Sequence, residues 1–422
     1  MERETTGTDR VAVVGAGPGG MAAALAAHRS GFDVDLYEAY PEIKAAGNIL
    51  NLWPPPQKVL KLIGVDTEDL GAPANSSFRR NDGRIRATVI LPQEVKDEYG
   101  GGFIGLLRWG LYQRMIAALP QGVLQMNKRL TRFDDGPDGV TLHFEDGTTA
   151  QADVLIGGDG LRSTVRRQLW GEEPIREQGL HLVGGYLFLD GPPPNDTVIM
   201  HDRTTQGSYS AIRHEGRYGY EWWVLEAFDP AQPFDEDLHA WALARARRFA
   251  DPLPQLVADT PREHLQRWPI RDRKPLAQWS QGRVTLVGDA AHPTSPYAAY
   301  GAGMSIEDGY FLACELERVD VRDPAAVRSA LQAYEERRKP HTAQVTEMAY
   351  KLGRMFHHAP APLRPIRDLV YDHTPLLQKV IGEQTPSHIL KQLAEIDAVE
   401  AARPDGYGAR RSVTQTPSSV RR

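Results

Sequence analysis

The stretch Gly15-Ala16-Gly17-Pro18-Gly19-Gly20 decides the fold of this chain. It follows the apolar run 11–14 directly and precedes the alanine-rich segment 21–28, after which residues 32–37 alternate apolar and polar side chains. That order predicts a strand, a tight turn, a helix and a second, parallel strand joined by a right-handed crossover. Glycines in the turn permit close approach of a phosphate group to the unpaired amides at the helix N-terminus.

An acidic residue completes this pattern. Glu38 lies at the end of the predicted second strand, where a carboxylate accepts hydrogen bonds from a ribose hydroxyl. A GxGxxG stretch alone is weak evidence, but the strand before it, the helix after it and the acid beyond it together predict a dinucleotide site. The motif does not distinguish FAD from NAD. The predicted contacts are Gly15, Gly17, Pro18, Gly20 and Glu38.

Residues 182–225 have the pattern of an antiparallel sheet rather than of a parallel one. Short alternating runs typical of strands occupy 182–189, 197–201, 208–213 and 218–225. They predict a mostly antiparallel sheet inserted into the nucleotide-binding domain. Helical spacing is found in 235–249 and 325–355, and a buried-strand pattern returns at 284–287.

We therefore predict an α/β fold, in which a Rossmann-type nucleotide-binding domain is interrupted by a mostly antiparallel β-sheet substrate domain and followed by C-terminal helices. The predicted bounds are 1–75, 105–179 and 271–360 for the discontinuous nucleotide-binding domain, 76–104 and 180–270 for the sheet domain, and 361–402 for the C-terminal helical segment. Residues 403–422 are rich in Arg, Ser, Thr, Pro and Gly, and this composition predicts a disordered tail.

Composition narrows the class of protein. The 422 residues carry a formal net charge of −6, so general attraction to nucleic acid is not expected. The single cysteine, Cys314, excludes an internal disulfide, and no apolar run is long enough to predict a membrane span or a signal peptide. We expect a cytoplasmic protein, a monomer or a homodimer. No cluster of His, Cys, Asp or Glu has metal-ligand spacing, so we predict no metal site.

Two further segments carry a family resemblance. Residues 152–163, ADVLIGGDGLRS, and 288–293, GDAAHP, follow the glycine stretch in the chain. Together the three resemble the DG and GD motifs and the fingerprint of the class A FAD-dependent aromatic hydroxylases, the family of p-hydroxybenzoate and salicylate hydroxylases, over residues 10–355. The resemblance implies an FAD-binding domain, with Asp159 in the motif linked to FAD and to NAD(P)H docking, and Asp289 on the ribityl chain. Arg108, at an expected helix start, resembles the family's cofactor-contacting arginine.

The segment 296–308 resembles the family's loop and helix beside the isoalloxazine ring. Pro296, Gly301, Ala302 and Gly303 occupy the positions that this likeness assigns to the cofactor, where helix N-terminal amides stabilise negative charge on reduced flavin. The match is imperfect, because Ala299, Tyr300 and Gly303 replace the family's usual glycine, glutamine and asparagine. Gly47, in a degenerate form of the GAGIxL stretch, is a further predicted cofactor contact.

The family resemblance implies a reaction. NAD(P)H, as NADPH or NADH, reduces non-covalent FAD, O2 adds to give a flavin hydroperoxide, and one oxygen atom is transferred to a small aromatic or electron-rich substrate. Tyr209 and Arg213 are the predicted catalytic residues, since they lie in an aromatic strand region expected to form the pocket wall. The further pocket candidates are Tyr220, Trp222, Tyr297 and Tyr300.

Other activities use the same cofactor motifs. An FAD-dependent epoxidase or reductase acting on a polyketide or isoprenoid remains an alternative that only substrate data separate. A flavin-dependent halogenase is disfavoured, because the Trp-x-Trp-x-Ile-Pro stretch of tryptophan-type halogenases is absent. A non-enzymatic binding module on this fold would need the glycine fingerprint but not the two later motifs.

Overall fold

A computed structural model describes residues 9–43, 49–191, 195–229, 231–234 and 237–403. Among these residues a parallel five-stranded sheet, the nucleotide-binding sheet, has the order β17-β11-β1-β2-β7. Its strands are β1 (Arg10–Val14), β2 (Asp33–Tyr37), β7 (Leu124–Gln125), β11 (Val154–Gly157) and β17 (Val284–Leu286). The predicted strand, turn, helix and strand are confirmed, because β1 pairs in parallel with both β2 and β11.

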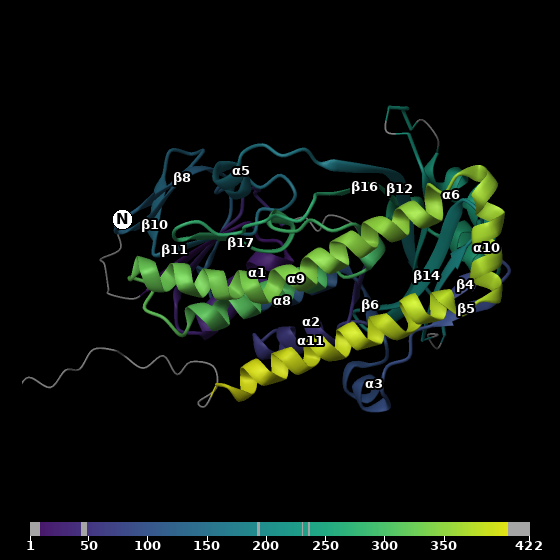
Figure 1. Ribbon diagram of the computed structural model, residues 1–422, viewed down its shortest axis with the longest axis horizontal. Helices are drawn as coiled ribbons and strands as arrows, with labels where there is room; N and C mark the ends of the chain where they lie inside the picture. Colours follow the sequence, from purple (N-terminus) through teal and green to yellow (C-terminus); the bar gives the residue numbers. More distant parts are fainter. Residues whose placement is uncertain (1–8, 44–48, 192–194, 230, 235–236, 404–422) are drawn as a thin grey trace, which may run out of the picture.

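A small antiparallel sheet, which we did not expect from the sequence, is formed by the residues between β7 and β11. It consists of β8 (Leu130–Gly136), β9 (Gly139–Phe144) and β10 (Thr149–Ala152). Strand β9 alternates buried and partly buried positions, as expected for a sheet that packs on one face only. It extends the nucleotide-binding half at the end farthest from the large sheet described next (Figure 1).

The large sheet has nine strands among the described residues, in the order β16-β12-β15-β14-β13-β4-β6-β3, with β5 paired to β4. Its strands are β3 (Ile49–Leu52), β4 (Ala72–Arg80), β5 (Ile85–Thr88), β6 (Phe103–Leu107), β12 (Arg176–Phe188), β13 (Asp196–His201), β14 (Thr205–His214), β15 (Arg217–Ala227) and β16 (Gln266–Asp272). The mostly antiparallel pattern has two exceptions, since β13 pairs with β4 in parallel and β14 with β6. Strand β3 belongs to this sheet, although residues 1–75 were expected in the nucleotide-binding domain.

Helices pack on both sheets and join them. Helices α9 and α11 run lengthwise from the nucleotide-binding half to the large sheet, and α6 and α10 lie at the far end (Figure 1). None of the described helices combines the length and the apolar composition needed to cross a bilayer. The α-helices are α1 (Pro18–Arg29), α2 (Pro54–Leu62), α3 (Gln93–Tyr99), α4 (Arg108–Ala118), α5 (Thr164–Trp170), α6 (Leu238–Ala246), α7 (Leu253–Asp259), α8 (Gly301–Leu316), α9 (Pro324–His357), α10 (Arg364–His373) and α11 (Gln384–Ala401). The short helical turns are η1 (Arg262–His264), η2 (Gly288–Ala290), η3 (Pro296–Ala298), η4 (Ala361–Leu363) and the π-helical η5 (Gln378–Glu383).

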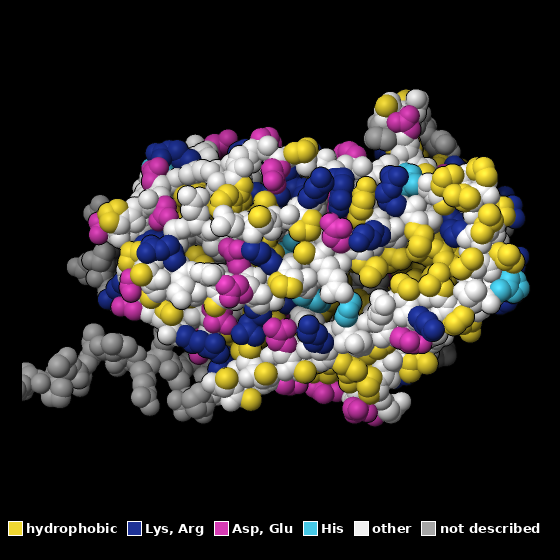
Figure 2. Space-filling model, viewed as in Figure 1, with side chains coloured by type: hydrophobic (Ala, Val, Ile, Leu, Met, Phe, Trp, Pro, Cys, Tyr) yellow, Lys and Arg dark blue, Asp and Glu magenta, His cyan; other side chains and the backbone are white. Residues whose placement is uncertain are grey.

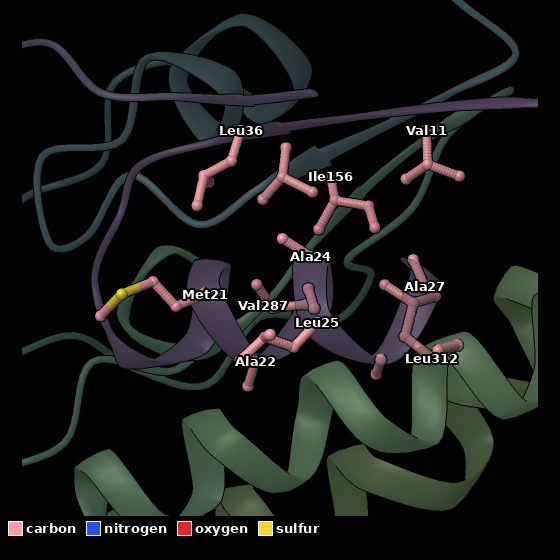
Figure 3. Close-up of a cluster of buried hydrophobic side chains, with 14 of the residues drawn as sticks. Val11, Met21, Ala22, Ala24, Leu25, Ala27, Leu36, Ile156, Val287 and Leu312 are labelled. Atoms are coloured by element: carbon pink, nitrogen blue, oxygen red, sulfur yellow. The ribbon is translucent and has the colours of Figure 1, made fainter. Parts of the chain in front are cut away.

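The core of the nucleotide-binding half explains the alanine-rich sequence of α1. This helix lies between the strands that carry Val11, Leu36 and Ile156 and helix α8, which carries Leu312 (Figure 3). A helix that is covered on both sides must be apolar around its whole circumference. Its side chains must also be short if the sheet and α8 are to pack closely against it. The closest approach is at Gly309 of α8, where an added Cβ would lie 2.4 Å from the backbone nitrogen of Ala23.

A buried ion cluster joins α8, α9 and the turn after β17. Arg338 of α9 donates from Nε to Asp308 Oδ1 (2.8 Å), and its Nη2 lies 2.9 Å from Glu307 Oε2. Asp308 Oδ2 in turn accepts from the Gly288 amide (3.0 Å) and bonds His292 Nε2 (2.5 Å). Burial alone would raise the pKa of Asp308, but His292 and Arg338 lower it to about 2. The carboxylate is therefore ionised at neutral pH.

Replacement of Asp308 by Asn is expected to lower the free energy of unfolding by about 3–5 kcal/mol at pH 7, because Arg338 would remain charged in the core without this partner. In the wild-type protein the contribution of Asp308 is complete above about pH 4, its ordinary range, and is lost as the pH falls towards 2. Chemical denaturation across this pH range measures both effects.

Glu347→Gln is the matched control for Asp308→Asn. Glu347 lies on α9 as well, but its ion pair with Lys351 is exposed and 3.9 Å long, so its loss should cost less than about 0.5 kcal/mol. Equal effects of the two substitutions would contradict a buried, charged Asp308.

Candidate functional site

The turn between β1 and α1 forms the base of the site. Gly15 has φ +97°, and an added Cβ would lie 2.5 Å from the carbonyl oxygen of Gly158, so only glycine fits. Gly17, by contrast, faces open space, with no heavy atom within 4 Å of an added Cβ. Pro18 begins the helix, and the first intrahelical bond is from the Met21 amide to Gly17. The helix thus presents its N-terminal amides to an open cradle of phosphate size.

Glu38 lies beside this turn, as the sequence predicts. Its Oε2 accepts from the Ala16 amide (2.8 Å), and its Oε1 accepts from the Tyr40 amide (3.1 Å). The half-buried carboxylate therefore fixes the turn and stays next to the cradle, where each oxygen retains a lone pair for a hydroxyl donor.

Three residues that are distant in the sequence approach one buried tyrosine. Burial raises the pKa of the Tyr112 hydroxyl; Arg108 opposes this shift, whereas Asp289 and Glu38 add to it. Arg108 begins α4, and Asp289 lies exposed in η2 directly after β17. The structure thus brings Arg108, Asp289 and Glu38 within electrostatic reach of Tyr112. Tyr112 itself was missed, because a tyrosine four residues into a helix has no distinguishing sequence pattern.

Asp159 lies next to the glycine turn, but its carboxylate already accepts hydrogen bonds within the protein. Its Oδ2 accepts from the Thr164 amide (2.7 Å), and the Ser163 hydroxyl donates to its Oδ1, so the carboxylate caps α5. Its Cα would lie 2.8 Å from an added Cβ on Gly15. The DG motif therefore contacts the glycine fingerprint through backbone atoms. The Asp159 side chain is used to cap the N-terminus of α5.

The loop before α8 leads into the helix that packs on α1. Ala299 has φ +49°, the left-handed conformation that the family's glycine adopts without strain, and Trp53 Nε1 donates to its carbonyl oxygen (3.0 Å). Helix α8 makes its first intrahelical bond from Met304 to Tyr300. The amides of Gly301, Ala302 and Gly303 therefore have no acceptor in the helix.

Several predicted pocket residues lie in a different layer. Tyr209, Tyr220 and Trp222 all point to the face of the large sheet that α6 and α7 cover. Trp222 is fully buried and donates to Thr260 Oγ1 (2.7 Å), while the Tyr220 hydroxyl donates to Asp196 (3.1 Å). The structure does not bring these three side chains to the motif residues.

The remaining predictions divide in the same way. Arg213 forms an ion pair with Asp69, lies over the Tyr218 ring at 5.0 Å and pairs through its backbone with Leu106 of β6. Tyr300 is adjacent to them but buried, and its hydroxyl donates to Glu307 (2.6 Å). Gly47 lies outside the described residues.

The opposite face of the large sheet, which we call the inner face, adjoins the α8 loop. Tyr297 packs there against the cluster of Leu180, Leu182, Leu225 and Ile270, together with the partly exposed Trp223 and Trp268. The Tyr297 hydroxyl bonds His201 Nε2 (2.9 Å) and His357 Nε2 (3.4 Å). Of the aromatic run on β15, Trp223 therefore lies on the inner face and Trp222 on the face that α6 and α7 cover. Sequence alternation separates the two faces but does not say which one is covered by helices.

Comparison with known proteins agrees with this geometry. Residues 115–349, more than half of the chain, match the family described as FAD binding domain, and residues 9–108 match the family described as pyridine nucleotide-disulphide oxidoreductase. A 6-hydroxynicotinate 3-monooxygenase of Bordetella bronchiseptica is 32% identical, over 82% of this chain and 91% of the relative. A 3-amino-4-hydroxybenzoate 2-monooxygenase of Streptomyces platensis is 30% identical, over 87% and 93%.

Solved structures share the fold over nearly the whole chain. Klebsiella pneumoniae HpxO, crystallised with FAD and uric acid, has a TM-score of 0.78 and 26% identity, with 92% of this chain and 98% of that chain covered. Together these matches place the chain in a class of flavoproteins that oxidise aromatic compounds. The chain belongs to the class A FAD-dependent aromatic hydroxylases, and it is an FAD-dependent monooxygenase.

The residues of the site fit FAD. The open cradle at Gly17 suits the pyrophosphate, and the α8 amides suit the negatively charged edge of reduced flavin. Glu38, Arg108 and Asp289 all act electrostatically on Tyr112, and their carboxylate and guanidinium groups suit the hydroxyl and phosphate groups of the cofactor. The chain therefore binds FAD, and among the described residues no group of His, Cys, Asp and Glu is arranged to hold a metal ion.

Gly17→Val tests the cradle. The added side chain enters open space and the backbone is extended at φ −76°, so the apoprotein should melt within about 2 °C of wild type. The same side chain occupies the position of the phosphate, so the dissociation constant of FAD, measured by fluorescence titration, should rise at least roughly tenfold. Unchanged FAD affinity would contradict the assignment. Gly15→Ala is the contrasting variant, because it meets backbone and should impair folding itself.

Proposed function

We propose that the protein uses NAD(P)H and O2 to hydroxylate a small aromatic or similarly electron-rich substrate. The observation that carries the proposal is the juxtaposition of two surfaces: the α8 N-terminus, which fits the flavin, and the aromatic inner face of the large sheet. When bound, FAD supplies the transfer of electrons from NAD(P)H and the activation of O2. The relatives named for hydroxynicotinate, hydroxybenzoate and urate support an aromatic substrate.

The protein's part is to bind the ring and exclude water. Trp223, Trp268 and Tyr297 offer partly exposed ring surface next to a fully apolar cluster, which suits a flat aromatic molecule. A dry pocket also protects a reactive oxygen species from water. Tyr297 joins the two halves of the site, since it belongs to the loop before α8 and packs on the inner face.

A directed chain of hydrogen bonds holds the Tyr297 hydroxyl. His357 Nδ1 donates to the Thr204 carbonyl (3.0 Å), because a carbonyl can only accept. Burial lowers the pKa of His357 to about 4, so at pH 7 the ring is neutral and its Nε2 accepts from Tyr297. The Tyr297 oxygen then accepts from His201 Nε2, whose ring burial also keeps neutral. The hydroxyl is thereby kept in one orientation, and burial keeps it protonated by raising its pKa.

Oxidation of NADH and of NADPH by the FAD-loaded protein tests the proposal directly. Phenols, hydroxypyridines and aromatic acids are added in turn under 18O2, and the products are analysed by mass spectrometry. A compound that accelerates NAD(P)H oxidation and gains one labelled oxygen atom establishes hydroxylation. If the protein is never reduced by either nicotinamide, the proposal is wrong; if it is reduced and yields an epoxide or a reduced product, the alternative activities replace hydroxylation.

Tyr297→Phe is expected to lower kcat/KM roughly tenfold, because two hydrogen bonds that orient the loop before α8 are lost. Tyr209→Phe is the matched control, since the Tyr209 hydroxyl lies on the face covered by α6 and α7, and its kcat/KM should stay within about twofold of wild type. Steady-state kinetics with the substrate found above measures both. If Tyr209→Phe lowered kcat/KM more than Tyr297→Phe does, the active site would lie on the face covered by α6 and α7, and the proposal would be wrong.

A further inference from the structure

Helix α10 turns its charged side chains towards the protein. Both of its aspartates form ion pairs there. The pairs join Asp372 to Arg80, Arg84 and Arg86 of the β4–β5 hairpin, and Asp368 to Arg203 and Arg367. Within α10, all of which the structure describes, Tyr371 alone is buried, and it packs on Phe356 with ring centroids 5.4 Å apart. The inward face of α10 is therefore held more by charge than by apolar packing.

The opposite face of this helix is apolar and exposed. Leu363, in the turn just before α10, is 53% exposed, Ile366 is 58% exposed and Leu369 is 59% exposed. Side chains three positions apart lie on one side of a helix, and the exposed Pro362 and Pro365 adjoin them. We call these five residues the outer α10 face. A helix that only covers a core turns its apolar stripe inward, so this face has no role in folding and marks an interaction surface.

The charged groups around the outer α10 face are mainly positive. The side chains of α10 and the residues ion-paired to them include six arginines and three aspartates, which are Arg80, Arg84, Arg86, Arg203, Arg364, Arg367, Asp82, Asp368 and Asp372. The chain as a whole has a formal net charge of −6, so this end of the molecule differs in sign from the rest. Figure 2 shows Lys and Arg side chains beside the hydrophobic side chains that lie over α10.

This charge distinguishes between two possible occupants of the face. In a symmetric dimer the same patch of each subunit meets its copy, so one excess of arginines would face another. A bilayer that contains anionic lipids instead attracts arginine side chains, while apolar side chains of a helix lying in its plane enter the boundary between headgroups and acyl chains. An anionic membrane surface therefore complements both properties of the outer α10 face.

An apolar hollow on the same side of the molecule also favours a lipid surface. Figure 2 shows this hollow, bordered by hydrophobic side chains, between the later part of α9 and the η5–α11 segment. Leu352 of α9, Val370 of α10 and Val380 of η5 are partly buried against the same core as Tyr297. Apolar molecules concentrate in lipid rather than in water, so an apolar opening is better supplied beside a bilayer than beside a protein partner.

We propose that the protein docks on an anionic lipid bilayer through the outer α10 face. Leu363, Ile366 and Leu369 enter the headgroup region, and the surrounding arginines bind lipid phosphates. The proposal concerns a surface outside the FAD site and does not depend on the proposed reaction.

Co-sedimentation of the FAD-loaded protein with lipid vesicles tests the proposal. Vesicles of phosphatidylcholine with about 30% phosphatidylglycerol should bind the protein at least roughly tenfold more tightly than vesicles of phosphatidylcholine alone. Binding to the anionic vesicles should fall at least roughly fivefold between about 0.05 and 0.5 M NaCl, because salt screens the arginines. Equal binding to both kinds of vesicle, or binding to neither, overturns the proposal.

Two leucine variants with the same change in charge locate the contact. Leu369→Asp places a carboxylate in the outer α10 face, so its affinity for the anionic vesicles should fall at least roughly tenfold. Leu390 of α11 is exposed as well, at 37%, but lies outside this face, so the affinity of Leu390→Asp should stay within about threefold of wild type. Both side chains are exposed, and both variants should melt within about 2 °C of wild type. Equal affinities of the two variants would contradict the proposed contact.

An arginine pair of variants tests the charge. The Arg203 side chain is 70% exposed, and Arg203→Gln should weaken binding to the anionic vesicles about fivefold. Arg318, just after α8, is 45% exposed, and Arg318→Gln should change binding less than about twofold. If the wild-type protein instead forms a dimer without lipid, and Leu369→Asp makes it monomeric in sedimentation velocity, a second copy covers the face and the membrane proposal is wrong.

Discussion

The buried contact between Arg338 and Asp308 is the interaction on which the rest of the structure depends. Through Asp308 it reaches the Gly288 amide and His292 in the turn after β17, and through Arg338 Nη1 it reaches Gln392 of α11 (3.0 Å). Four segments that are far apart in the sequence thus meet at one ion cluster. A charge pair with its hydrogen bonds satisfied has strict geometry, so it sets the relative positions of these segments more narrowly than apolar packing does.

That geometry fixes two helix N-termini next to each other. Helix α8 leaves the cluster towards Gly301 and packs on α1 so closely that Gly309 meets backbone and an added Cβ on Gly19 would lie 3.2 Å from the Ser305 side chain. The N-terminal amides of α1, which suit a phosphate, and those of α8, which suit the negative charge of reduced flavin, are consequently held at a constant separation.

The large sheet has two faces with different roles. One is closed by α6 and α7 over Tyr209, Tyr220 and Trp222, and it works as an ordinary core. The inner face has Tyr297 of the α8 loop against it, with partly exposed aromatic rings and neutral polar groups. Since side chains alternate along a strand, the aromatic run on β15 contributes to both faces: Trp222 packs under α6 and α7, and Trp223 lies on the inner face.

The sequence by itself determined the fold class, the strand and helix of the glycine fingerprint, and FAD as the cofactor, because these depend on local periodicity and on motifs read within a few residues. It also predicted Glu38 next to the glycine turn, where its carboxylate accepts from the Ala16 amide. It did not determine that β3 joins the large sheet, that Asp159 caps α5, or which face of the sheet α6 and α7 cover. Those features depend on which helices cover which surface. Only the tertiary structure decides that, because contacts such as that of His201 with Tyr297 join residues almost a hundred positions apart, and no local pattern records them.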